Sequence, residues 1–75
     1  MRNVSKQDAK KIAVDFVRTK RKEERISVSY IEQKKDVWIV QGTCPIDLEG
    51  HPWTEKFEVV VDQKGNVTSN DFSLL

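Results

Sequence analysis

The chain has little of what builds a disulfide framework or a metal site. Its 75 residues include one cysteine, Cys44, and one histidine, His51. A single cysteine cannot form a disulfide within the chain, and a closed structural zinc site usually has four nitrogen or sulfur ligands. We therefore expect no metal and no cofactor, and the lone thiol fits a reducing compartment.

Long apolar runs are also missing. No stretch approaches the roughly 18–20 apolar residues that span a bilayer, and the polar residues 1–6 lack the apolar region of a secretory signal. We expect a cytoplasmic protein that does not enter a membrane. A chain of 75 residues forms one domain, residues 1–75, with a small core.

The net charge of +1 hides an uneven distribution. Residues 1–25 carry nine Lys or Arg against four Asp or Glu, a balance of +5. Residues 26–75 carry four against eight, a balance of −4. Such asymmetry is typical of a surface for nucleic acid or an acidic partner, and equally of two halves of one fold that attract each other.

Residues 5–23 have the pattern of an amphipathic helix. Ser5 is a good N-cap, and Asp8 three residues later completes a capping-box-like pair. Apolar residues recur at the spacing of one helical face, and they are Ala9, Ile12, Ala13, Phe16 and Val17. The sequence therefore predicts one helix over about 5–23.

The rest of the chain alternates with period two, which predicts four strands that begin at Ile26, Val37, Trp53 and Val67. Pro45 is expected to end the second strand, because proline cannot continue a central ladder, and residues 46–52 are then an irregular loop. Short connections favour an antiparallel meander with the helix on one face. The predicted fold is a two-layer α+β domain of order α-β-β-β-β.

A single helix leaves the second face of this sheet open or covered by a partner. Val60 lies on that face of the third strand, because Val59 and Val61 point the other way. The predicted sheet therefore carries apolar side chains on the face that the helix does not cover.

The register of the first hairpin is left open by the sequence. A two-residue turn at Lys34-Lys35 pairs Tyr30 with Ile39, and a three-residue turn pairs it with Trp38. Depending on the turn, the face of the sheet opposite Tyr30 carries either Val37 and Ile39 or Trp38 and Val40.

These patterns favour a non-enzymatic interaction module. It binds a protein or a peptide, including a second copy of this chain, through the open sheet face or an edge strand. The predicted loop also suits binding, although its apolar residues could instead close one end of the core. The candidate partner-binding residues are Val37, Ile39, Val60, His51 and Trp53.

Nucleic-acid binding is the first alternative. It would use an outward basic arc of the helix, formed by Lys10, Lys11, Arg18, Arg21 and Lys22. The arc carries no aromatic residue on which a base could stack, and we favour a solvated helix face as its explanation. We therefore consider nucleic acid an unlikely partner.

A thiol enzyme is the second alternative. Cys44 and His51 are seven positions apart, close enough to meet within one loop, but the spacing suggests no third orienting group. The sequence contains no Gly-rich phosphate loop, serine elbow or zinc spacing. We expect no catalytic residues, and we do not expect an enzyme.

Segments 37–40 and 57–67 resemble PepSY-like domains. Those domains also begin with a helix of the type seen at residues 9–13, continue with a Trp-containing strand, and end in a Val-Asp-x-x-Gly-x-Val hairpin, here Val61 to Val67. Cystatin-like domains share this helix-plus-meander pattern. The resemblance implies the same fold, no catalytic residues, and a role in binding peptides or restraining peptidases, usually in exported or membrane-linked proteins.

Overall fold

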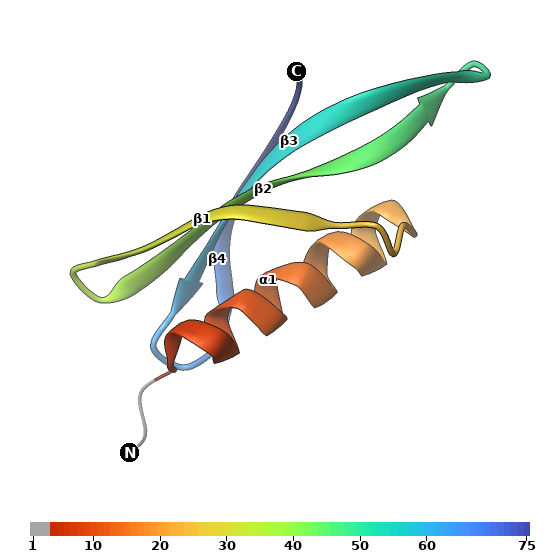
Figure 1. The fold of residues 1–75 in the computed structure, drawn as a ribbon. Helices are drawn as coiled ribbons and strands as arrows, with labels where there is room; N and C mark the ends of the chain where they lie inside the picture. The colour runs from red at the N-terminus through yellow and green to blue at the C-terminus, as the bar shows by residue number, and fades with distance from the viewer. Residues whose placement is uncertain (1–3) are drawn as a thin grey trace.

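The computed structural model describes residues 4–75, and residues 1–3 of the predicted domain lie outside the described residues. The described chain forms α1 (Lys6–Arg21), β1 (Ser27–Lys34), β2 (Val37–Leu48), β3 (His51–Asp62) and β4 (Val67–Leu74). The strands make one antiparallel sheet in chain order, and α1 lies across one of its faces (Figure 1). The predicted α+β meander is confirmed.

Helix α1 has well-defined ends. The Asp8 backbone amide donates to Ser5 Oγ, and the Asp8 carboxylate accepts from the Ser5 amide, so the predicted capping box is formed. Lys22 ends the helix in the left-handed conformation, with φ of 54°. The residues that α1 buries are Ala9, Ala13 and Val17, and their small side chains let the helix axis approach the sheet closely.

The core lies between α1 and the middle two strands. Val40 of β2 and the alternating Phe57, Val59 and Val61 of β3 are fully buried. Trp38 packs at the edge of this core, and its indole Nε1–H donates to the Val4 carbonyl at 2.9 Å. Because strand side chains alternate between faces, burial of this set fixes which residues point away from α1.

Each edge strand contains one bulge. The pairing of β1 with β2 skips Ser29, and the pairing of β4 with β3 skips Thr68. The two hydroxyls act alike: Ser29 Oγ donates to the Gln41 carbonyl, and Thr68 Oγ1 donates to the Val60 carbonyl. An unpaired residue shifts the register by one position and changes which side chains share a face.

Both predicted registers of the first hairpin are wrong, because its turn lies one residue beyond Lys34-Lys35. The turn lies at Lys35-Asp36, with Lys34 opposite Val37, and Tyr30 is opposite Gln41. The bulge at Ser29 has a separate effect: Val28 points toward the helix, whereas Tyr30 faces the other side and is 47% exposed.

The predicted loop 46–52 is also wrong, because β2 continues through Pro45 to Leu48 and β3 begins at His51. Only Glu49 and Gly50 form the turn, and both have positive φ, 53° and 81°. Residues 45–54 therefore form a two-stranded arm beyond the last pairs made by β1 and β4 (Figure 1).

Proline can lie in this arm because of where it falls in the hydrogen-bond pattern. In a hairpin with a two-residue turn the closing pair, here Leu48 and His51, exchanges hydrogen bonds, and alternate residues direct their backbone groups outward. Pro45 and Pro52 occupy such outward positions. Each removes an amide that could pair with another strand, so strand addition at the arm is disfavoured.

Candidate functional site

The candidate site is the open face, defined as the face of the sheet opposite α1. Ile39 of β2 and Val60 of β3 are direct cross-strand partners near its centre, and both are half-buried. Val37 lies two residues before Ile39 on the same face, and Tyr30 reaches the face from β1. Three of the five predicted partner-binding residues, Val37, Ile39 and Val60, thus lie together.

Strand β2 forms an uncharged column along the open face. Its outward residues from one end to the other are Val37, Ile39, Gln41, Thr43 and Pro45, all half-buried. At about 3.4 Å per residue the column is about 27 Å long. A continuous neutral column in a chain with 33% charged residues is a surface that a partner can cover without removing a charge from water.

Charged side chains border this column, and most of them are acidic. In the observed register Gln41 is opposite Glu58, and Glu58 is opposite Asp71. The Gln41 amide donates to Glu58 Oε1 at 2.7 Å, which holds the carboxylate against the sheet. By the same alternation, the charged residues that flank the column are the acids Glu32, Glu58, Asp62 and Asp71 and the lysines Lys34 and Lys56. Asp47 follows Pro45 on the same face, beyond the end of the column.

The titration of two groups reflects this surface. Loss of hydration raises the pKa of the Tyr30 hydroxyl, and the charge and hydrogen bonding of nearby Glu32 raise it further. The Asn66 backbone amide, which donates to Asp62 Oδ1 at 2.8 Å, holds the pKa of Asp62 below its ordinary value of 3.8. Asp62 therefore stays an anion at neutral pH.

The other two predicted partner-binding residues lie elsewhere. His51 and Trp53 are in the arm. They lie on the same side of β3 as Phe57 and Val59, the side that faces α1. Along β3, His51 is nine residues from Val60, or about 30 Å. The structure therefore divides the predicted set between the open face and the arm.

Arg21 does not lie on the outward basic arc that was predicted for the helix. This side chain turns to the sheet, where its Nε and Nη2 donate to the two oxygens of Glu55 at 2.6 and 2.9 Å. Its guanidinium also lies 4.2 Å from the centre of the Phe72 ring. Glu55 is only 7% exposed, so Arg21 neutralises a buried charge.

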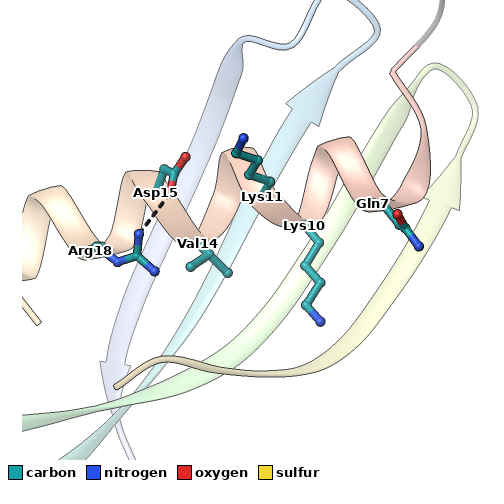
Figure 2. Close-up of a pocket in the computed structure, with 6 residues that line it drawn as sticks. All are labelled: Gln7, Lys10, Lys11, Val14, Asp15 and Arg18. Carbon is teal, nitrogen blue, oxygen red and sulfur yellow. Dashed lines mark hydrogen bonds and ion pairs between the residues drawn. The ribbon is translucent and has the colours of Figure 1, made fainter. Parts of the chain in front are cut away.

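The remaining cations of the arc are spread along the exposed side of α1. Lys10, Lys11 and Arg18 line an open hollow of ≈ 480 Å³ together with Val14 and Asp15. Figure 2 shows the two lysines pointing in different directions, and the Arg18 guanidinium pairs with Asp15 at 3.2 Å. Lys22 caps the helix C-terminus. The arrangement is a solvated helix face rather than a focused cluster of cations.

Cys44 does not meet His51. The thiol is 1% exposed in the core, whereas His51 is exposed at the tip of the arm, opposite Leu48. Burial raises the pKa of the Cys44 thiol, and the neighbouring Glu55 carboxylate, 3.9 Å from the sulfur, raises it further. A buried thiol beside a carboxylate is a poor nucleophile.

Sequence reasoning missed the Glu58–Asp71 pair and the position of Tyr30. Both depend on bulges, which leave only a weak local signal: Ser29 and Thr68 are hydroxyl residues within otherwise alternating segments. It also missed Glu55 as the partner of Arg21. That pair joins residues 34 positions apart, and helical spacing alone placed Arg21 on the outside.

In residues 4–75, no group of three or more His, Cys, Asp or Glu residues is arranged to hold a metal ion. No helix in the same part of the chain is long and apolar enough to cross a membrane. Comparisons of the chain with protein-family models, with curated proteins and with solved structures gave no match. The resemblance to PepSY-like domains therefore stays a prediction.

Proposed function

We propose that this protein is a non-enzymatic interaction module that binds a protein or peptide through the open face of its sheet. The observation that carries the proposal is the uncharged column of β2 with Val60 beside it. On the opposite face, the same two strands pack under α1 into a closed core. Sheets are stable with one solvated face, but such a face normally alternates to polar residues.

A face contact is favoured over strand addition. The arm lacks outward amides at Pro45 and Pro52. The edge strands of the sheet are β1 and β4, which contain bulges at Ser29 and Thr68, and β4 has a mostly polar sequence. Both devices discourage pairing with another strand. The open face has no comparable block among the described residues.

A peptide selection with two variants tests the proposal. Displayed random peptides of about 20 residues are selected on the wild-type protein, and each enriched peptide is measured against Val60→Lys and Val14→Lys. Both variants replace a half-buried valine by lysine, one on the open face and one on the outer side of α1. Circular dichroism and denaturant unfolding confirm that each variant is folded.

We expect peptides that lose at least about tenfold in affinity to Val60→Lys, since a buried lysine must be desolvated, and that bind Val14→Lys normally. Peptides that ignore Val60→Lys, or that depend on Val14 instead, would contradict the proposal. A selection that enriches no peptide above background would contradict it as well.

A further inference from the structure

The dimensions of the open face match those of a helix. The uncharged column runs along one strand for about 27 Å, which matches a helix of about 18 residues at 1.5 Å per residue. Across the sheet, β1 and β3 are two strand spacings apart, or about 10 Å, which is close to the diameter of a helix. A helix along β2 would give the sheet a second layer like α1.

A second copy of this chain is a poor occupant. Two open faces placed together bring acids against acids, because Glu32, Glu58, Asp62 and Asp71 outnumber the two lysines of the face. The helix of another copy has no suitable side to offer, because its small apolar residues are buried in its own core. On the outer side of that helix, Val14 is the apolar residue of a hollow otherwise lined by polar and charged groups.

The acids of the open face include a pair that is unfavourable in the free protein. Glu58 and Asp71 are direct cross-strand partners, and like charges in that position destabilise a sheet. Among the described ion pairs, none includes either residue. The Gln41 amide that reaches Glu58 carries no charge to offset the repulsion. A local conflict of this kind is expected where a site serves binding rather than stability.

We propose that the open face receives a cationic amphipathic helix from another protein. The apolar side of this helix lies along β2, and one of its Lys or Arg side chains lies over the Glu58–Asp71 pair. This inference rests on the proposed function, because it names the partner chemistry of the same face. Charge complementarity sets the orientation of the helix, and the uncharged column supplies the contact area.

Two designed peptides of 18 residues test the inference. They share one apolar side, and the residues that flank it are Lys and Arg in one peptide and Glu in the other. Binding is measured by isothermal titration calorimetry at two salt concentrations, and the contact surface is mapped by backbone amide chemical shifts. The second part of the experiment uses the double variant Glu58→Gln/Asp71→Asn, with Glu24→Gln/Glu49→Gln as its matched control. The control removes the same charge from two exposed positions off the open face, one in the connection after α1 and one in the turn at the tip of the arm.

We expect the cationic peptide to bind at the open face at least about tenfold more tightly than the acidic one, and more weakly at high salt. Glu58→Gln/Asp71→Asn should weaken this binding about three- to tenfold, whereas Glu24→Gln/Glu49→Gln should change it less than about twofold. The free Glu58→Gln/Asp71→Asn protein should unfold at a slightly higher denaturant concentration, because the repulsion is gone. If Glu58 and Asp71 had only a structural role, their replacement would not raise the stability of the protein and lower its affinity for the peptide at the same time.

Other outcomes overturn the inference in ways that separate it from the proposed function. Equal binding of the acidic peptide, or no binding of either peptide, excludes a cationic helix, and the peptide selection then still decides whether the face binds anything. Concentration-dependent dimerisation that Val60→Lys abolishes identifies a second copy as the occupant. If the cationic peptide binds but shifts amides of α1 or of the arm alone, both the inference and the use of this face are wrong.

Discussion

The two faces of the sheet are built from alternate residues of the same strands, yet they are specified in different ways. On the covered face, Val59 is fully buried under α1, and its shape must match its neighbours. Its neighbour Val60 points to the open face and is only half-buried. The covered face is fixed by close packing, whereas the open face is defined by an uncharged column and the charges beside it. Substitutions on the two faces should therefore differ in what they change.

The largest effect is expected where the covered face has no room for a methyl group. A Cβ at Gly42 would lie 2.1 Å from the Ser27 carbonyl oxygen and 2.6 Å from the end of the Phe57 ring. Gly42→Ala should therefore destabilise the fold by about 3 kcal/mol or more, measured by denaturant unfolding. Gly50→Ala is the control: it meets no atom within 4 Å, but its φ of +81° leaves a cost of about 1–2 kcal/mol. Equal stability of the two variants would contradict this account of the covered face.

The next effect concerns the ion pair that joins α1 to the sheet. Arg21→Ala leaves Glu55 buried with no cation, which should cost about 3 kcal/mol of unfolding free energy. Arg18→Ala breaks the exposed pair with Asp15 and should cost less than about 1 kcal/mol. Thermal or denaturant unfolding of both variants measures the contrast. If they proved equally stable, the inward turn of Arg21 would not hold the helix to the sheet.

Neighbouring valines give the most direct comparison of the faces. Val59→Ala removes two fully buried methyl groups and should cost about 2 kcal/mol. Val60→Ala should cost less than about 1 kcal/mol, because its side chain is only partly removed from water. Denaturant midpoints report the stabilities, and binding of a selected peptide reports the open face. We expect Val59→Ala mainly to lower the free energy of unfolding, and Val60→Ala mainly to lower the affinity for the peptide.

The smallest effect depends on pH and lies at one end of the open face. The pKa of Asp62 is lowered in the folded protein, so its carboxylate stabilises the fold above the ordinary pKa of 3.8. This contribution is lost as the pH falls through the lowered pKa. The stability difference between the wild type and Asp62→Asn should therefore be constant near neutral pH and shrink in strongly acidic solution. If the stability difference between the wild type and Asp62→Asn grew as the pH fell, the pKa of Asp62 would be raised by folding, which contradicts the account above.

Periodicity and capping were sufficient to predict the architecture. The capping box of Ser5 and Asp8 and the apolar stripe of the helix placed α1 within two residues at its C-terminal end. The phase of Val59 and Val60 was also visible, because a pleated strand has a period of two. What could not be predicted was the register of the edge strands. A single bulged residue, Ser29, moves Tyr30 to the opposite face without changing the composition of the strand.

The candidate site was only partly visible for the same reason. Val37, Ile39 and Val60 follow from alternation within strands, which is local information. The Glu58–Asp71 pair requires the register of β3 with β4, and the bulge at Thr68 changes that register by one residue. Pro45 misled the prediction because proline is incompatible only with inward ladder positions. Its outward position in β2 depends on where the turn at Glu49 falls.

The order of the strands has a consequence for how the chain folds. Each strand pairs only with its neighbours in sequence, so every hairpin of the sheet closes across a short turn at a small entropic cost. The docking of α1 is different. Arg21 of α1 contacts Glu55, and Trp38 contacts Val4 just before α1, and each contact joins residues 34 positions apart. Topologies dominated by local pairing fold quickly. We therefore expect the meander to form rapidly, and the docking of α1 to limit the rate at which the core closes.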